Sequence, residues 1–339
     1  MFKPRNPPNP FHDVTYEREE PPLPARLEIR EDHAKTAIRE IDSPDIGFRW
    51  SLNPYRGCTH ACAYCYARRT HEYLDLGAGS DFERVLMVKH DLAEVLEAEL
   101  GRKSWKGEVI HMAGVTDLYQ PIERKLKITR ACLEVLVRYR NPVAIITRSP
   151  LVERDLDLLL QLAEHKAVTV SFSIPILDAD VCRALEPGTM PPAARLRAME
   201  ALASAGIPVG VSLAPVIPGL TDHLIPRTLQ AARAAGATWA FMSALRLPGN
   251  VETVFVDRLR EALPLRAEAV FDRIRRAHHG QMKTSAFGDR MRGHDQVWAL
   301  TDQVFDTTCK RLGFTSPPPY PEVSPFRVPG RGVQLAMFG

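Results

Sequence analysis

The chain has 339 residues, of which 45% are hydrophobic and 25% charged, and its formal net charge is +3 at pH 7. These proportions are those of a globular enzyme with one large domain or two ordinary ones, and they exclude a disordered or collagen-like chain. No apolar run approaches the roughly 20 residues that a membrane-spanning helix needs, and Met1 leads into prolines and charges. We therefore expect a cytoplasmic protein with no membrane partner. A net charge this small does not by itself indicate a nucleic-acid partner.

Residues 1–45 hold eight prolines among mixed charges. This composition buries little apolar surface, so we expect a Pro-rich N-terminal extension that lies on the domain as an arm or is partly disordered. A second proline-rich stretch, residues 315–339, is expected to form a flexible tail that ends in the peptide Gln-Leu-Ala-Met-Phe.

A short strand is expected at residues 46–52, and it leads into a loop with the spacing C-x3-C-x2-C, formed by Cys58, Cys62 and Cys65. Thiolates this close in sequence can reach different corners of a cubane iron–sulfur cluster, and three of them leave one iron open to a small molecule. The alternative is a non-catalytic zinc-binding or nucleic-acid-binding protein, with His60 or His71 completing a zinc knuckle. The other cysteines stand alone, and no disulfide framework is expected.

Short β-branched or apolar runs then alternate with amphipathic stretches, which is typical of parallel strands joined by helical crossovers. Strands are expected at residues 85–89, 108–112, 143–147, 167–174, 208–214 and 238–244, and helices at residues 126–139, 152–165, 193–205 and 226–235. About six units are too few for a complete barrel of eight. The pattern therefore predicts an α/β fold with a partial (β/α)6 barrel over residues 46–255, in which functional loops follow the carboxyl ends of the strands. Residues 256–314 are predicted to form a C-terminal helical segment, with helices at 258–278 and 295–312.

Polar residues follow two of these strands, and others lie within a third. Gly114, Thr116 and Asp117 come after the strand at 108–112, where a glycine lets a ligand approach the backbone and the two polar side chains can bind an ammonium or ribose group. Their alternative role is to cap a helix that has Glu123 in its first turns.

Arg148 ends the strand at 143–147 and can pair with a ligand carboxylate or, alternatively, with a surface acid. Ser171 and Ser173 share one face of the strand at 167–174, so they can reach a ligand or form structural bonds to backbone.

The cysteine loop resembles that of radical S-adenosylmethionine (radical SAM) enzymes, in which an aromatic residue such as Tyr64 precedes the last cysteine. The wider run NPYRGCTHACAYCYAR resembles the uncharacterised relatives of spore photoproduct lyase described as DNA repair photolyase-like. The resemblance implies a [4Fe-4S] cluster and S-adenosylmethionine as cofactors, and an electron donor of the flavodoxin or ferredoxin type. It also implies reductive cleavage of S-adenosylmethionine to a 5′-deoxyadenosyl radical that abstracts hydrogen from a substrate.

The resemblance further implies which residues hold these groups. Cys58, Cys62 and Cys65 would bind the cluster, and the residues expected to bind the cofactor are Tyr64, Gly114, Thr116, Asp117, Arg148, Ser171 and Ser173. Glu186 and Arg195 would form an ion pair that shapes the site. Spore photoproduct lyase places a hydrogen-donating cysteine close to the loop after the strand at 108–112, and Gly114 falls roughly where it would be. This chain has no cysteine between Cys65 and Cys132. Repair of that particular thymine lesion is therefore in doubt.

Two further features bear on the substrate and on partners. A basic cluster with aromatic residues occurs late in the chain, which can track a phosphate backbone or can be a solvated helix face: Arg273, Arg275, Arg276, His278, His279, Lys283, Phe287, Arg290 and Arg292. Residues 334–338 resemble the peptide with which bacterial repair and replication proteins bind the sliding clamp, although Leu335 and Phe338 can instead pack back on the domain.

Together these features predict a radical SAM enzyme, of lyase-like or other radical chemistry, that acts in DNA or other nucleic-acid repair or modification. The alternative within the same family is an enzyme that acts on a peptide or small molecule. The sequence does not identify the hydrogen abstracted, a catalytic residue or the oligomeric state.

Overall fold

The structure is a computed structural model, and it describes residues 6–11, 27–112, 114–283, 287–288 and 290–330. The predicted clamp-binding peptide at 334–338 lies outside the described residues. Within the described residues, no helix combines the length and the apolarity needed to cross a membrane.

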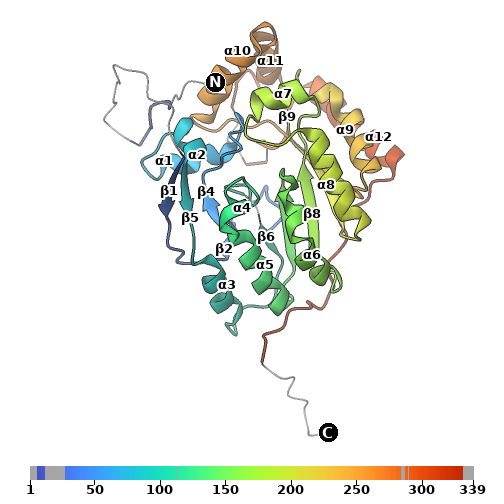
Figure 1. The fold of residues 1–339 in the computed structure, drawn as a ribbon. Helices are drawn as coiled ribbons and strands as arrows, with labels where there is room; N and C mark the ends of the chain where they lie inside the picture. The colour runs from blue at the N-terminus through green and yellow to red at the C-terminus, as the bar shows by residue number, and fades with distance from the viewer. Residues whose placement is uncertain (1–5, 12–26, 113, 284–286, 289, 331–339) are drawn as a thin grey trace.

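A curved sheet with six parallel strands forms the centre of the molecule (Figure 1). Their order is β3 (Trp50–Leu52), β6 (Ile110–Met112), β7 (Val143–Thr147), β8 (Val168–Ser173), β9 (Val209–Val216) and β10 (Trp239–Ala244). The short strand β2 (Arg39–Glu40) pairs antiparallel with β3, so the sheet ends at β2 on one side and at β10 on the other. The predicted partial barrel is confirmed, and the end at which these strands finish is called the mouth below.

The strand expected at residues 85–89 exists, but its predicted place in the barrel is wrong. β5 (Val85–Val88) lies in a separate three-stranded sheet between β1 (Glu28–Glu31) and β4 (Tyr55–Arg56). Since β4 leads directly into the cysteine loop, this small sheet anchors the start of that loop. The N-terminal extension thus contributes strands to both sheets. The periodicity of a strand shows only that it is buried, not which sheet it joins.

Most of the helices cover the outer face of the barrel, and the others lie toward its mouth (Figure 1). They are α1 (Arg69–Glu72), α2 (Ser80–Arg84), α3 (Leu92–Leu100), α4 (Glu123–Leu126), α5 (Ile128–Tyr139), α6 (Leu156–Ala163), α7 (Ala179–Leu185), α8 (Pro192–Ser204), α9 (Ile225–Ala234), α10 (Val251–Ala262), α11 (Pro264–Ala277) and α12 (Gln296–Leu312), with 3-10 turns at η1 (Tyr66–Arg68), η2 (Pro150–Asp155) and η3 (Asp222–Leu224). The helix expected at 258–278 is in fact two, because Pro264 has no backbone N–H with which to continue α10. The expected domain boundary at residue 255 falls inside α10.

Strand β8 shows how the sequence separates the two faces of the barrel. Val168, Val170 and Phe172 are buried in the hydrophobic core beneath the helices. The alternate residues, Thr169, Ser171 and Ser173, therefore lie on the inner face. The indole of Trp239 on β10 crosses Gly210 and donates to the Ser171 hydroxyl at 3.2 Å. A Cβ on Gly210 would lie 2.1 Å from that indole, so only glycine allows this crossing.

The end of the barrel opposite the mouth is closed by the described part of the predicted tail. Tyr320 donates to the carbonyl of Val143, the first residue of β7, at 2.9 Å. Its hydroxyl also lies 2.9 Å from that of Thr169, and Phe326 stacks on Tyr139. Residues 315–328 are therefore held against the end of the barrel opposite the mouth (Figure 1).

Candidate functional site

The cysteine loop is fixed at its start by a glycine that no other residue can replace without strain. Gly57 has φ +81°, and a Cβ there would lie 2.7 Å from the carbonyl oxygen of Val85. The next residue, Cys58, donates its backbone N–H to Phe82 at 3.0 Å. Cys58 and Cys62 are buried, and Cys65 is partly exposed.

The middle of the loop lies directly against the segment after α7. Ala63 donates to the carbonyl of Leu185 at 2.8 Å, and Gly188 donates to that of His60 at 3.1 Å. A Cβ on Gly188 would lie only 1.9 Å from the carbonyl oxygen of Thr59, so the two backbones can approach only because residue 188 is glycine. This contact places the segment that follows β8 and α7 beside the cysteine loop.

Arg68 fixes the end of the loop, and the sequence analysis assigned it no role. Its side chain is fully buried and donates to the carbonyl oxygens of Cys62, Ala78 and Gly79 at 2.9 to 3.0 Å. It also pairs with Glu83 at 2.5 Å. The only signal in the sequence is a basic residue shortly after the last cysteine, and that signal does not show that the side chain is buried.

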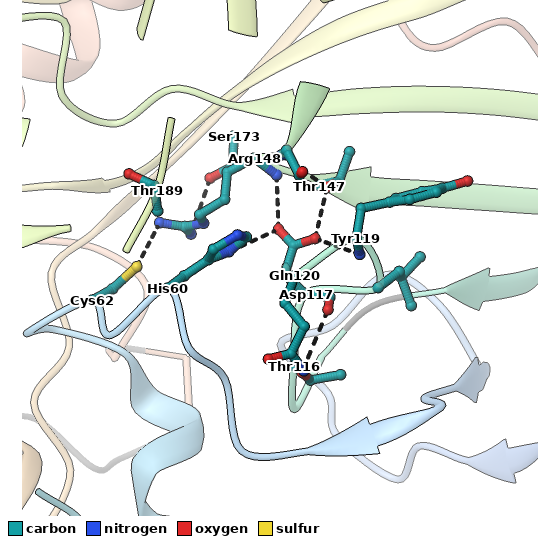
Figure 2. Close-up of polar contacts among 12 residues, drawn as sticks. His60, Cys62, Thr116, Asp117, Tyr119, Gln120, Thr147, Arg148, Ser173 and Thr189 are labelled. Carbon is teal, nitrogen blue, oxygen red and sulfur yellow. Dashed lines mark hydrogen bonds and ion pairs between the residues drawn. The ribbon is translucent and has the colours of Figure 1, made fainter. Parts of the chain in front are cut away.

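Asp117 lies at the centre of a set of polar contacts at the mouth (Figure 2). Its carboxylate accepts hydrogen bonds from the Thr147 hydroxyl at 2.7 Å and from the backbone N–H groups of Tyr119 and Arg148 at 2.9 and 2.8 Å. His60 of the cysteine loop lies 3.6 Å away. Burial lowers the pKa of His60 to about 4, so this imidazole is neutral at pH 7. Asp117 thus ties the loop after β6 to the end of β7.

Thr116 and Gln120 connect this same loop to the cysteines. Thr116 donates to the carbonyl of Gly57 at 2.8 Å, while Gln120 donates to Thr116 and accepts from the backbone of Thr59 at 3.0 Å each. Gln120 is fully buried and was missed because a glutamine in a loop carries no signal of burial. The helix-cap alternative for Thr116 and Asp117 is wrong, since α4 begins only at Glu123.

Gly114 stands at the start of this loop with φ +125°, and the next residue donates to Asn53 at 3.1 Å. A Cβ at Gly114 would meet only Asn53, at 3.8 Å. The backbone here is therefore open to a neighbouring group.

Arg148 brings a positive charge to the cysteine loop. One of its terminal nitrogens lies 3.1 Å from the Cys62 sulfur and 3.0 Å from both the Tyr64 hydroxyl and Glu186, and the other donates to Ser173 at 3.3 Å. The alternative of a surface acid is wrong, because Glu186 is fully buried. Four of the predicted site residues, Cys62, Tyr64, Arg148 and Ser173, therefore meet here.

Glu186 holds this group together, and the predicted ion pair with Arg195 is confirmed. The Glu186 carboxylate accepts hydrogen bonds from Arg195, from Arg148 and from the Tyr64 hydroxyl. Burial raises the pKa of Glu186, but Arg195 and Arg148 outweigh it and lower that pKa to about 2. The carboxylate is therefore ionised throughout the neutral range and keeps two arginines in place.

Two predicted features, Ser171 and the late basic cluster, do not join the group of side chains around Arg148 and Glu186. Ser171 accepts from Trp239, two residues back along β8 from Ser173. The late basic cluster is largely neutralised, because Arg275 pairs with Asp272 at 2.8 Å and Arg290 with Asp45 at 2.5 Å. Lys283 and Arg273 also have acids at 3.9 and 4.0 Å, on α10 and in η3. Asp272 lies only three residues before Arg275, but the other partners come from distant parts of the chain and could not be inferred from the sequence.

The donor set fits a cluster held by three thiolates. In the described part of the chain, no three His, Cys, Asp or Glu side chains converge as the ligands of one metal ion do. Thiolates that bind separate corners of a cluster need not converge in this way. Neither histidine of the zinc alternative supports a fourth ligand: His71 lies 2.9 Å from the Val85 carbonyl, and His60 faces Asp117.

The surroundings of Cys58 and Cys62 disfavour ionisation of their thiols in the absence of a metal. Burial raises the pKa of Cys58 to about 12 and that of Cys62 well above its ordinary value. Bound iron stabilises a thiolate directly, so this burial suits cysteines that are metal ligands.

Comparisons with known proteins agree with this geometry. Residues 52–232 match the family model described as the Radical SAM superfamily. An uncharacterized protein of Mycobacterium tuberculosis is 38% identical over 234 residues, which cover 68% of each chain. An uncharacterized protein of Methanocaldococcus jannaschii is 31% identical over 198 residues, which cover 58% of this chain and 71% of that protein.

Two solved structures share the fold. Spore photoproduct lyase complexed with dinucleoside spore photoproduct has a TM-score of 0.61 at 15% identity, covering 88% of this chain and 86% of that chain. A variant of that enzyme with bound AdoMet and dinucleoside spore photoproduct has a TM-score of 0.59 at 15% identity, covering 85% and 82%.

Proposed function

The chain belongs to the radical SAM superfamily, and from this premise we propose that Cys58, Cys62 and Cys65 hold its cluster and that its substrate is a nucleic acid. As a member it is an enzyme whose cofactors are a [4Fe-4S] cluster and S-adenosylmethionine. The cluster, when bound, supplies the electron that cleaves S-adenosylmethionine to the 5′-deoxyadenosyl radical. The non-catalytic alternative is thereby wrong.

The observation that carries the cluster assignment is the arrangement of the three thiols. They occupy one loop at the mouth of the barrel, fixed at Gly57, Gly188 and Arg68, with a guanidinium beside Cys62. Three ligands leave one iron of a cubane open, which is where S-adenosylmethionine binds in this family.

Arg148 and its partners are suited to orient the methionine end of S-adenosylmethionine. A guanidinium binds a carboxylate with two parallel hydrogen bonds, and Ser173 adds a hydroxyl beside it. Tyr64 and Glu186 keep Arg148 in position. At the neighbouring strand end, Gly114 leaves its backbone open, and Thr116 and Asp117 shape the loop that would face the methionine ammonium group. Ser171 is assigned to the ribose side, further inside the barrel.

A nucleic-acid substrate is supported by the shared fold with spore photoproduct lyase, solved with a dinucleoside spore photoproduct. We propose nucleic-acid repair or modification as the broad role. Repair of the same lesion is not assigned, because position 114 is a glycine and Cys132, Cys182 and Cys309 lie on helices α5, α7 and α12. A peptide or small-molecule substrate is the competing outcome of the tests below.

Anaerobic reconstitution with iron and sulfide tests the cofactor assignment. We expect about four irons and four sulfides per chain, a brown protein, and 5′-deoxyadenosine when S-adenosylmethionine and a strong reductant are added. Purified protein that keeps zinc at the three thiols and forms no 5′-deoxyadenosine would contradict the assignment.

Binding of DNA at several salt concentrations tests the substrate class. A nucleic-acid enzyme should bind oligodeoxynucleotides with an affinity that falls linearly with salt on logarithmic axes. Transfer of deuterium from labelled DNA into 5′-deoxyadenosine would then identify it as substrate. Transfer from a labelled peptide, with no salt-dependent DNA binding, would favour the competing class.

Two partners complete the proposal. A flavodoxin or ferredoxin in the cytoplasm would supply the electron. Residues 334–338 would bind the sliding clamp, and the described tail supports this because it is held at the end of the barrel opposite the mouth (Figure 1). Loss of clamp binding in the variant Phe338→Ala, with DNA binding unchanged, is the expected result; equal clamp binding by both proteins would count against it.

A further inference from the structure

Arg246 places a positive charge at the mouth, and it has no role in binding the cluster or S-adenosylmethionine as proposed. It follows the end of β10 by two residues, on the loop that runs back toward the cysteines. Its guanidinium carbon lies 4.7 Å from the centre of the Tyr66 ring, and Tyr66 directly follows Cys65. Across residues 6–11, 27–112, 114–283, 287–288 and 290–330, we find no hydrogen bond or ion pair that occupies its N–H groups.

Asp45 is a described acid whose charge acts on Arg246, and it is already engaged elsewhere. Asp45 accepts hydrogen bonds from the Gly288 backbone at 2.8 Å and from Arg290 at 2.5 Å. Burial lowers the pKa of Arg246, and the charge of Arg290 adds to this effect. A partly buried cation without a carboxylate partner is costly, and such groups are common where a charged ligand binds.

A second arginine stacked on an aromatic ring stands close by. The guanidinium of Arg290 lies 4.2 Å from the centre of the Phe287 ring. Both rings are open to solvent, with Tyr66 46% and Phe287 59% exposed. Among the described residues, Arg246, Arg290 and Asp45 together carry a single positive charge, and it lies beside two exposed rings. A ligand with one negative charge between flat groups complements this arrangement, and a phosphodiester between two bases is such a ligand.

We propose that Arg246 binds a phosphate of the nucleic-acid strand at the mouth, with Tyr66 and Phe287 as stacking surfaces for the adjoining bases. This rests on the nucleic-acid substrate proposed above. The face of the Arg246 guanidinium is covered by Tyr66, so its N–H edge is left to make two parallel bonds to phosphate oxygens. Stacking on aromatic rings tolerates any base, which suits a site that positions a strand rather than reads it. A nucleotide held there lies beside Cys65, next to the cluster.

Fluorescence anisotropy of a labelled single-stranded oligodeoxynucleotide, measured on reconstituted protein at several salt concentrations, tests this. The variant Arg246→Met should weaken binding about ten-fold or more and lower the salt slope by about 0.7, the value for one phosphate contact on a single strand. Arg246→Lys should restore the salt slope but only part of the affinity, because a lysine ammonium cannot make the two parallel hydrogen bonds of a guanidinium. Arg138→Met is the matched control. It removes the same charge from an exposed side chain on α5, at the end of the barrel opposite the mouth.

Iron content shows whether each variant is folded. Binding by Arg246→Met that equals binding by Arg138→Met would overturn the Arg246 site while leaving a nucleic-acid substrate in place. No binding by the unmodified protein, even at low salt, would overturn both that site and the proposed substrate class. The same assay distinguishes a nucleic-acid strand from a free nucleotide as the source of the phosphate. If a free mononucleotide competes with the same affinity as the oligodeoxynucleotide, the site binds a single nucleotide, and binding of a strand is contradicted.

Discussion

Cys62→Ala is expected to leave the reconstituted protein with far fewer than four irons per chain and to abolish formation of 5′-deoxyadenosine. Two thiolates cannot replace three, because removal of Cys62 frees a second iron and takes away the ligand beside Arg148. The same result is expected for Cys58→Ala and Cys65→Ala. Iron and sulfide analysis with the characteristic visible absorption measures the loss.

The matched control is Cys309→Ala, which removes a partly exposed thiol from α12. It should retain its full iron content and its cleavage activity. Normal iron in Cys62→Ala, or equal loss in Cys309→Ala, would show that the loop is not the cluster site.

Glu186→Gln is expected to lower the free energy of unfolding of the protein without its cluster by about 3 kcal/mol at pH 7. The substitution keeps the shape of the side chain but removes the single negative charge between Arg148 and Arg195. The buried guanidinium of Arg195 and the partly buried one of Arg148 would then repel each other, and Arg148 would no longer be held beside Cys62. Urea denaturation monitored by circular dichroism measures the change.

The pH dependence provides a sharper test of the same carboxylate. Its pKa is about 2 in the folded protein against 4.5 in the unfolded chain, so its stabilising effect is complete above the unfolded value and is lost as the pH falls toward the folded value. The difference in stability between the unmodified protein and Glu186→Gln should therefore narrow below about pH 5 and fall to less than half by about pH 3. A difference that stays constant over this range would mean that Glu186 does not act through its charge.

Asp180→Asn is the control, on helix α7, which ends just before Glu186. Its carboxylate also pairs with an arginine, Arg183, but both side chains are largely exposed. Exposed pairs contribute little, so this variant should change the free energy of unfolding by less than about 0.5 kcal/mol at any pH. A loss as large as that of Glu186→Gln would point to a general effect of charge on α7.

Several features of the molecule followed from the sequence alone. The strand expected at 143–147 matches β7 residue for residue. The strand expected at 167–174 is longer than β8 by one residue at each end, and that expected at 238–244 is longer than β10 by one residue at its start. Buried parallel strands give continuous apolar runs, and Gly206 and Gly236 end their helices at φ +88° and +93°. The cysteine loop was equally clear, because three cysteines within eight residues form a local pattern.

What the sequence could not decide depends on contacts between distant segments. Strand β5 has the periodicity of a barrel strand, yet it pairs with β1 and β4 in another sheet. Gln120 and Arg68 are polar residues whose burial follows only from the carbonyl groups that surround them after folding. Glu186 lies 38 positions from Arg148 and 122 from Tyr64, and only the folded barrel brings the three together.

The sequence by itself thus determined the class of fold and which cysteines are proposed as cluster ligands, because both depend on spacing along the chain. The tertiary structure decided which side chains surround those ligands. Arg148 reaches Cys62 only because β7 ends beside the cysteine loop, and Arg246 reaches Tyr66 only because the loop after β10 returns to it. A charge acts over a few ångströms of space, whatever the number of residues between the groups, so its partners cannot be inferred before the strands are in place.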